Sequence, residues 1–239
     1  MEREVRIAAV TTAAEHIVPP LVQAFSARRP ELSLTLDVGN RKHVFQRVSR
    51  HEADLAIGGR PPAEGELVGE PFLENPIMLI TAPDDPLARR RAVPVYELGE
   101  RPWLLREPGS GTRTMTEEFL TRHELRPQML TMGSNGAIKQ AVRAGLGVSL
   151  QSHAATALEL EHGLLGAVSL REPLPRRQWF ALWPSTGPLR EPVKDFLEFV
   201  TSGAAKRLVE RSWFADGAGR GRPGSRSRSS RKTARAKAR

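Results

Sequence analysis

Residues 5–25 read VRIAAVTTAAEHIVPPLVQAF, and this stretch decides the fold class of the amino-terminal part of the chain. Its first six residues are apolar apart from Arg6, which predicts a short buried strand. Pro19 and Pro20 fit only near the first turn of a helix, where a missing N–H group costs least. The following helix shows an apolar stripe at four-residue spacing, formed by Ile17, Leu21 and Phe25. A strand that runs directly into a helix indicates an α/β fold.

The alternation of strands and helices continues along the chain in two series. In the first, a strand at 32–38, a helix at 41–51 and a strand at 54–58 predict a parallel, doubly wound sheet with right-handed crossovers. A strand at 77–82 leads into a second series. That series has strands at 103–105, 128–132 and 147–150, helices at 112–123 and 135–144, and then a strand at 179–183 and a helix at 189–202. The sequence therefore predicts two similar α/β halves.

Composition separates this globular part from a basic tail. Residues 215–239 hold +8 of the formal net charge of +9, with seven Arg and two Lys against one Asp. Such a segment cannot bury enough apolar area to offset its ordering entropy, so we expect it to be disordered. It has two interpretations: weak binding of nucleic acid without sequence reading, or a solvated extension without a partner.

Targeting features favour a cytoplasmic protein. The chain has no Cys, which excludes disulfides and thiolate chemistry and fits a reducing compartment. The charged start, Met1-Glu2-Arg3-Glu4, shows no apolar signal region, and no apolar run approaches the roughly 20 residues of a membrane-spanning helix. We expect no association with a membrane.

The glycine-rich element at 106–113, REPGSGTR, is the strongest candidate for ligand binding. It lies between a predicted strand and a predicted helix, the edge at which parallel α/β sheets bind ligands. The N–H groups of Ser110, Gly111 and Thr112 and the helix dipole favour an anion, which Arg106 and Arg113 could neutralise. The alternative is an ordinary helix start capped by Ser110.

Five further candidate residues follow other strand ends. Thr11 and Thr12 carry hydroxyls at a strand–helix junction, Asn135 begins a helix, and Gly58 and Arg60 follow the third strand. Each alone is explained by helix capping or by a turn with a solvated arginine. Taken together, they line one cleft if the two halves face each other.

Catalytic chemistry has little support in this sequence. The six His are scattered without metal-ligand spacing, and no Gly-x-Ser-x-Gly motif occurs. Asp84 and Asp85 are flanked by proline and indicate a hinge turn rather than a metal site. We therefore expect no catalytic residues, no metal and no catalytic cofactor.

Several motifs resemble the effector-binding domain of LysR-type transcriptional regulators, over about residues 5–199. The general likeness rests on the start of the chain with FSARRP at 25–30, on DLAI at 54–57 and on DPLA at 85–88. A narrower likeness, to the regulators of RuBisCO and Calvin-cycle operons, rests on VGNR at 38–41, GRPP at 59–62, Asn75-Pro76, the element at 106–113 and SNGAIKQAV at 134–142.

This resemblance implies a fold like that of type II periplasmic binding proteins. Two Rossmann-like lobes would be joined by two crossover strands, near 80–83 and 182–184. Lobe I would comprise 1–81 and 184–214, and lobe II 82–183. A small anionic coinducer, in this group a phosphorylated metabolite or NADPH, would bind between the lobes. The residues expected to line that site are Thr11, Thr12, Gly58, Arg60, Arg106, Ser110, Gly111, Thr112, Arg113 and Asn135.

The resemblance also implies partners. Family members form homodimers or higher homo-oligomers and read DNA through a winged helix-turn-helix that precedes this domain. Because the first predicted strand begins at Val5, we expect a domain fragment, a misassigned start or a truncated regulator. The leading hypothesis is the ligand-sensing part of a regulator. The alternatives are a stand-alone solute-binding protein of transport type, or a lyase similar to prephenate dehydratase on a comparable scaffold.

Overall fold

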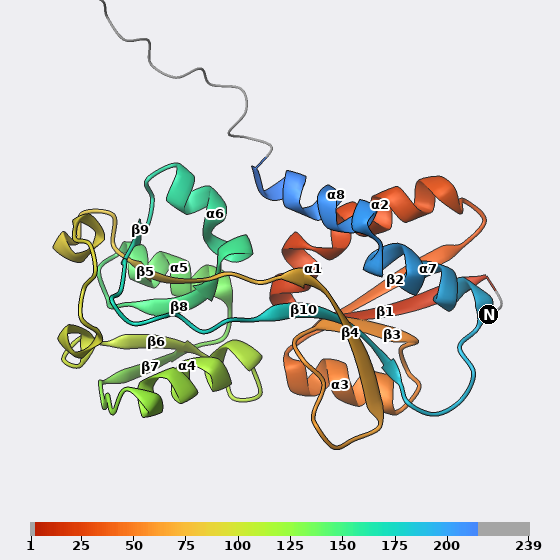
Figure 1. Ribbon diagram of the computed structural model, residues 1–239, viewed down its shortest axis with the longest axis horizontal. Coiled ribbons are helices and arrows are strands. Elements are labelled where there is room, and N and C mark those ends of the chain that lie inside the picture. Colours follow the sequence, from red (N-terminus) through yellow and green to blue (C-terminus); the bar gives the residue numbers. More distant parts are fainter. Residues whose placement is uncertain (1–2, 215–239) are drawn as a thin grey trace, which may run out of the picture.

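The computed structural model describes residues 3–214; residues 1–2 and 215–239, the second of which is the tail predicted to be disordered, lie outside the described part. The described chain forms two α/β lobes that lie side by side and are joined by two connections (Figure 1). The predicted two-lobed α/β architecture is thus confirmed.

Lobe I is built on a five-stranded sheet of order β2-β1-β3-β10-β4. The first three strands are parallel, but β10 is antiparallel to β3 and β4 is antiparallel to β10. The sheet is therefore mixed rather than parallel throughout, because its last two strands come from the crossovers. Its elements are β1 (Glu4–Val10), α1 (Thr11–His16), α2 (Val18–Arg28), β2 (Ser33–Gly39), α3 (Arg41–Ser49), β3 (Leu55–Gly58), β4 (Leu67–Glu74), β10 (Gln178–Pro184), α7 (Glu191–Thr201) and α8 (Gly203–Phe214).

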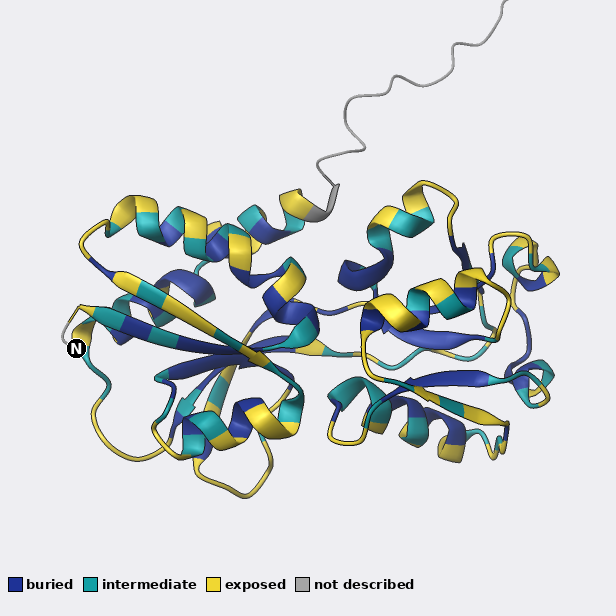
Figure 2. Cartoon of the chain, turned by 180° about the vertical axis from the view of Figure 1, so that it is seen from behind, coloured by how far each residue is buried: buried dark blue, intermediate teal, exposed yellow. Residues whose placement is uncertain are grey.

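Helices cover both faces of this sheet because successive strand residues point to opposite sides. In β1, Ile7 belongs to the cluster that includes Phe25 of α2 and Phe196 of α7. Its neighbour Ala8 belongs to the cluster on the other face, with Val44 and Val48 of α3. Figure 2 shows the result, with buried central strands and helices that are exposed only on their outward faces.

The helix predicted after β1 is in fact two helices, which meet at Ile17. Pro19 and Pro20 lie in the first turn of the second helix, α2. If α1 continued past Ile17, Pro19 and Pro20 would lack the N–H groups that bond to the preceding turn, and their rings would clash with its carbonyl groups. α1 therefore ends before these two prolines. Thr11 and Thr12 thereby begin a helix of only six residues, Thr11–His16.

In lobe II, as in lobe I, parallel strands lie beside antiparallel ones. Sheet β8-β5-β9 is antiparallel and sheet β6-β7 is parallel, and a parallel bridge between Trp103 and Val148 links them. Gly147 permits this close approach, since a Cβ there would lie 2.2 Å from the carbonyl oxygen of Pro102. The elements are β5 (Ile77–Thr81), η1 (Pro86–Arg89), η2 (Val95–Leu98), β6 (Trp103–Arg106), α4 (Gly111–Arg122), β7 (Met129–Met132), α5 (Asn135–Arg143), β8 (Ser149–Ser152), α6 (His153–Glu161) and β9 (Gly166–Ala167).

The chain changes lobes earlier than the sequence suggested. The expected boundaries placed 77–81 in lobe I and 178–183 in lobe II. Strand pairing places them the other way, because β5 bonds to β8 and β9 of lobe II, while β10 bonds to β3 and β4 of lobe I. The crossovers therefore lie at Asn75-Pro76 and just before Gln178. Hydrogen-bond partners, which hydropathy does not reveal, decide to which sheet a buried strand belongs.

Candidate functional site

A small cavity of about 40 Å³ lies between the lobes, where strands of both sheets end. We call it the inner cavity. Of the predicted site residues, six line it: Thr11, Thr12, Arg106, Ser110, Gly111 and Thr112. The two sets of strand ends, from β1 and from β6, therefore open onto one shared space, as the sequence predicted.

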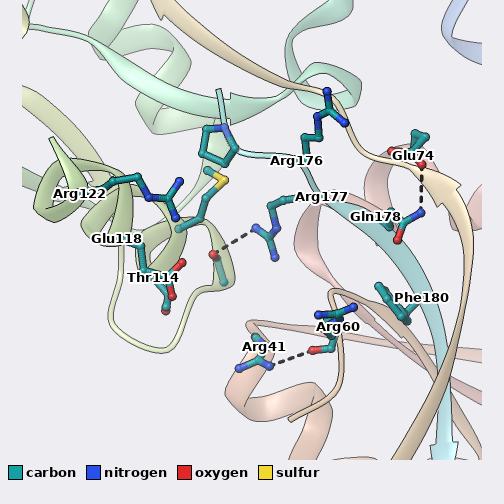
Figure 3. A pocket seen from close by; sticks show the side chains of 13 residues that line it. Arg41, Arg60, Glu74, Thr114, Glu118, Arg122, Arg176, Arg177, Gln178 and Phe180 are labelled. Atoms are coloured by element: carbon teal, nitrogen blue, oxygen red, sulfur yellow. Dashed lines mark hydrogen bonds between the residues drawn. The ribbon is translucent and has the colours of Figure 1, made fainter. Parts of the chain in front are cut away.

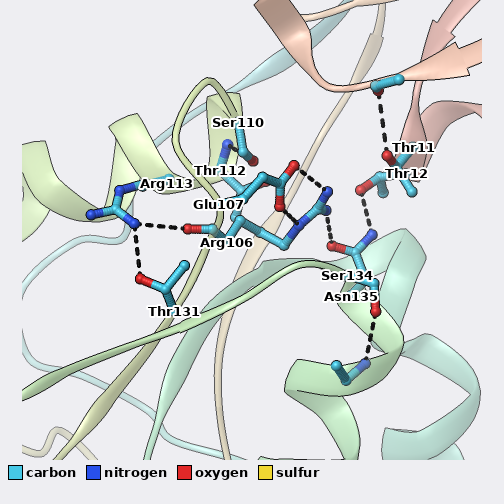
Figure 4. Close-up of polar contacts among 12 residues, drawn as sticks. Thr11, Thr12, Arg106, Glu107, Ser110, Thr112, Arg113, Thr131, Ser134 and Asn135 are labelled. Atoms are coloured by element: carbon cyan, nitrogen blue, oxygen red, sulfur yellow. Dashed lines mark hydrogen bonds and ion pairs between the residues drawn. The ribbon is translucent and has the colours of Figure 1, made fainter.

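Hydrogen bonds hold the lobes together around this cavity. The amide Nδ2 of Asn135 in lobe II donates to Oγ1 of Thr12 in lobe I at 2.8 Å (Figure 4). The backbone N–H of Lys42 donates to the carbonyl oxygen of Gly109 at 3.3 Å. Gly109 has a φ of +88°, a conformation that glycine adopts without strain, so the glycine-rich loop can reach α3.

Arg106 is almost fully buried, with 4% of its surface exposed, and its guanidinium is already engaged. Nε and Nη2 donate to the two carboxylate oxygens of Glu107 at 2.8 and 3.0 Å, and Nη1 donates to Oδ1 of Asn135 at 2.6 Å (Figure 4). Together with the Asn135–Thr12 bond, these contacts form a continuous polar chain from lobe II to lobe I. Arg106 thus lines the cavity, but its charge is compensated within the protein.

The start of α4 has the geometry expected for the glycine-rich element. Ser110 is the N-cap, and its Oγ accepts from the backbone N–H of Thr112 at 3.3 Å. The first backbone N–H groups of a helix have no partner within the helix and carry the positive end of its dipole. This end faces the inner cavity, so capping by Ser110 and a position at the ligand site are compatible.

The other predicted residues lie around the cavity rather than in its wall. Asn135 is buried behind it and holds Thr12 and Arg106, while the N-cap of α5 is the preceding Ser134. Gly58 ends β3, and the following residue, Gly59, lines the cavity instead. Arg113 points away, and its guanidinium donates to Thr131 and to the carbonyl oxygen of Arg106 (Figure 4). It also donates to Glu117 at 2.7 Å.

The inner cavity has further polar lining residues that we did not predict as site residues. They come mainly from the start of α3 and from the two crossovers, and are Asn40, Arg41, Asn75, Ser152 and Arg177. Asn40, Arg41 and Asn75 belong to motifs that carried the family resemblance, so they could have been chosen on that ground. Nothing near Arg177 in the sequence indicates a site, apart from the basic pair Arg176-Arg177 before a strand.

Trp179, also in the wall of the inner cavity, has an unusual feature. Its indole Nε1–H is buried and has no hydrogen-bond partner within the described residues. A buried donor without a partner costs about 1–3 kcal/mol relative to a paired one. An acceptor in the cavity would remove that cost if it came within reach of this N–H group.

A larger cavity of about 680 Å³ adjoins the inner one, and we call it the vestibule (Figure 3). Arg41, Gly111 and Arg177 line both spaces. The predicted site residue Arg60 belongs to the vestibule alone, together with Arg122 and Arg176. The site thus consists of a narrow inner part and a wide, arginine-rich outer part.

Within residues 3–214, no group of three or more His, Asp or Glu side chains is arranged to hold a metal ion. In the same range, no helix is both long and apolar enough to cross a membrane.

Two α/β lobes that hold a polar cavity between them define a two-lobed effector-binding domain. The chain belongs to the LysR substrate-binding-domain family, whose model, described as the LysR substrate binding domain, matches residues 1–205. The resemblance seen in the sequence motifs is therefore confirmed.

Relatives of the chain are transcriptional regulators, not enzymes. The RuBisCO operon transcriptional regulator of Allochromatium vinosum is 37% identical over 199 residues, which cover 83% of this chain and 66% of that protein. The RuBisCO operon transcriptional regulator of Acidithiobacillus ferrooxidans is 31% identical over 201 residues, which cover 84% and 65%. The chain thus spans slightly less than two thirds of the length of these relatives.

A solved structure is also similar to this chain over most of its length. The regulatory domain of CcmR from Synechocystis PCC6803, solved in complex with 2-PG, superposes with a TM-score of 0.80 at 31% identity. The match covers 85% of this chain and 97% of that domain.

Proposed function

We propose that the chain is the ligand-sensing part of a LysR-type transcription regulator and binds a small anionic, phosphorylated metabolite between its lobes. The observation that carries this proposal is the inner cavity, into which the start of α4 and the guanidinium of Arg177 face together. A helix N-terminus and an arginine are both favourable neighbours for a phosphate group. The related CcmR domain, solved in complex with 2-PG, supports the binding of a small metabolite.

Sensing requires that the ligand binds one arrangement of the lobes more tightly than the others. Thr12 in lobe I and Asn135 in lobe II already contact each other beside the cavity. A ligand bound to the loop of α4 and to the crossover would add further bonds to both lobes and favour the closed arrangement. DNA would be read by a helix-turn-helix outside residues 1–239, in a cytoplasmic protein.

Dimerisation belongs to the same proposal. β2 is an edge strand of lobe I, where Leu36 and Val38 are 40% and 48% exposed. β7 is an edge strand of lobe II, where Met129 is 53% exposed. Exposed apolar edge strands favour pairing with another chain. Two copies could therefore associate through these edges and the adjacent helices α2 and α5.

Calorimetric titration tests the ligand. Phosphoglycolate, phosphoenolpyruvate, sugar phosphates and NADPH would be compared with their unphosphorylated counterparts, such as glycolate against phosphoglycolate. We expect at least one phosphorylated compound to bind while its counterpart does not. If no phosphorylated compound in the panel binds, the proposed ligand class is wrong.

Analytical ultracentrifugation tests the dimer. Leu36→Glu with Val38→Glu places charges on the β2 edge and should convert dimers to monomers. Leu158→Glu is the matched control, because Leu158 is 56% exposed on α6, away from both edge strands. Equal dissociation constants for the two variants would remove β2 from the interface.

A further inference from the structure

A groove of about 340 Å³ lies where helix α1 of lobe I meets helix α6 of lobe II, and we call it the helix groove (Figure 1). Lobe I supplies Glu15, His16 and Pro20 to its wall, and also Ser212 near the end of α8. Lobe II supplies residues of α5 and α6. No residue of this wall also lines the inner cavity or the vestibule, so the helix groove is separate from the ligand site.

Acidic side chains outnumber basic ones in the wall of the helix groove. Glu15, Glu159 and Glu161 line it, and Lys139 lies among them. The Nζ of Lys139 contacts Oε1 of Glu159 at 2.6 Å, so this pair neutralises itself within lobe II. Glu15 and Glu161 are exposed, and neither forms an ion pair with a Lys or Arg among the described residues.

His16 does not neutralise Glu15 at neutral pH. Its Nε2 lies 3.6 Å from Oε2 of Glu15. Burial lowers the pKa of the His16 imidazole, and the attraction of Glu15 offsets this effect only in part, so the ring is uncharged at pH 7. Three carboxylates and one ammonium group therefore give the groove a net charge of about −2.

The floor of the helix groove is apolar and carries small side chains. Ala154, Ala155 and Ala157 of α6 line it, next to Leu158, which is 56% exposed. Small side chains leave room for a polypeptide backbone, and exposed apolar surface can be covered by the methylene stems of arginine and lysine. An acidic groove with such a floor fits a basic polypeptide segment.

The chain itself supplies a basic segment next to this groove. Ser212 lines the groove, and residues 215–239, which hold +8 of the formal net charge, begin three positions later. Arg220 is the first arginine of that segment and follows Phe214 by six residues, which span at most about 20 Å. Helix α6 has nine residues and a length of about 14 Å. The first arginines of the segment can therefore reach the whole groove.

We propose that residues 215–239 dock in the helix groove of their own chain and link the two lobes. Arg220 and Arg222 pair with Glu15 of lobe I and Glu161 of lobe II. Each such ion pair is weak, because both partners are exposed to solvent. Tethering compensates for this weakness, since a short connection keeps the segment at a high effective concentration beside the groove. Docking favours the arrangement of the lobes in which α1 and α6 are in contact.

Paramagnetic NMR of the full chain tests the docking. The chain has no Cys, so Ser225→Cys accepts a single nitroxide label within the basic segment. We expect the label to broaden the backbone amide signals of α1 and α6, and to leave those of residues 86–98, at the outer end of lobe II, unchanged (Figure 1). Salt at about 0.5 M should abolish the broadening, because it screens exposed charges.

A charge-reversal variant of the labelled protein identifies the groove. Glu15→Lys with Glu161→Lys changes two exposed side chains, so the fold should be retained. It should remove most of the broadening in α1 and α6. The matched control is Glu64→Lys with Glu100→Lys, which changes the net charge by the same amount at two exposed residues outside the groove. The control should keep the broadening.

Binding of DNA provides a second readout, because the basic segment could instead bind nucleic acid. Fluorescence anisotropy with a labelled duplex of random sequence would compare the two double variants. If the segment is docked, the groove variant releases it and should bind the duplex about threefold or more tightly than the charge-matched control.

Each outcome supports or overturns the docking. Absence of broadening in α1 and α6 overturns it, and salt-dependent binding of the duplex would then assign the segment to nucleic acid. Equal broadening in the groove variant and in the control also overturns it, as does equal affinity of these two variants for the duplex. Broadening that disappears only in the groove variant, together with its tighter binding of DNA, supports the proposal.

Discussion

Two pairs of arginines flank the inner cavity, and they differ in what they contact. Arg106 and Arg113, from the glycine-rich element, are paired with Glu107 and Glu117. Arg177, from the second crossover, and Arg41, from the start of α3, have no carboxylate partner among the described residues. The motif that stands out in the sequence therefore supplies the loop and the helix start, while the free positive charge comes from elsewhere. Whether an arginine can bind a ligand depends on its neighbours as much as on its position.

The largest effect is expected from removing Arg177. Arg177→Ala should weaken binding of the phosphorylated ligand by about 2–3 kcal/mol, because a charged hydrogen bond contributes that much. Arg113→Ala should cost less than about 0.5 kcal/mol, because its guanidinium faces away from the cavity. Calorimetric titration of both variants measures the contrast. Equal losses would show that the paired arginine binds the ligand after all.

The contrast between arginines with and without a carboxylate partner also predicts effects on the free energy of unfolding. Arg106→Ala should lower the free energy of unfolding by about 2 kcal/mol, because it leaves Glu107 and Asn135 without their partner. Arg177→Ala should be neutral or slightly stabilising, because it removes a partly buried charge that has no ionic partner among the described residues. Urea denaturation without ligand gives both values. A large loss of stability for Arg177→Ala would contradict the distinction between paired and unpaired arginines.

A smaller effect on ligand binding is expected when a side chain fills the space that holds the Arg177 guanidinium. In Gly59→Ala, the new Cβ would lie 2.7 Å from Nη2 of Arg177, so the guanidinium has to shift and binding should weaken by about 1 kcal/mol. The neighbouring Gly58→Ala is the control, since its Cβ would meet Val10 and Leu182 at 3.4 and 3.5 Å, ordinary contact distances. If Gly58→Ala weakened ligand binding more than Gly59→Ala does, the site residue would be Gly58, as the sequence predicted, and not Gly59.

The smallest effect concerns a paired group far from the cleft, Asp54. Burial would raise the pKa of its carboxyl, but hydrogen bonds from Arg6 and Arg190 outweigh burial and hold the pKa below its ordinary value of 3.8. The stability from these ion pairs is therefore fully present above pH 3.8 and is lost as the pH falls through the lowered pKa.

The contribution of Asp54 should be about 0.5–1 kcal/mol, and Asp54→Asn should flatten the acid limb of stability against pH. Thermal melts from pH 7 to pH 2.5 measure this. An unchanged acid limb in the variant would show that other carboxylates dominate acid unfolding.

Sequence periodicity predicted the elements with strong and regular apolar patterns, but it missed others. The edge strand β4 contains Gly69 and Pro71, which are unusual within a strand and are tolerated because β4 pairs on one side only. Helices α6 and α8 were also missed. The parallel arrangement predicted for the first three strands of lobe I is found, but the antiparallel direction of β10 was not predicted, since the direction of a crossover strand depends on distant pairing.

The site, too, could be predicted from the sequence only in part. Thr11, Thr12 and the loop around Ser110 meet because strand ends of a Rossmann-like lobe share one edge, a rule that sequence can apply. Arg177 could not be found in this way. It reaches the cavity because the second crossover passes between Gly59 and Gly111, and that contact depends on the packing of both lobes.

The position of β10 has a consequence for how the protein is made. Within residues 3–214, β4 pairs with β10 alone, and β10 lies between β3 and β4 in the finished sheet. During synthesis from the N-terminus, the three parallel strands of lobe I leave the ribosome first, yet one edge of β3 stays open until residues 178–184 have followed. All of lobe II is translated in that interval. Lobe II can thus complete its sheet before lobe I, although lobe I begins the chain.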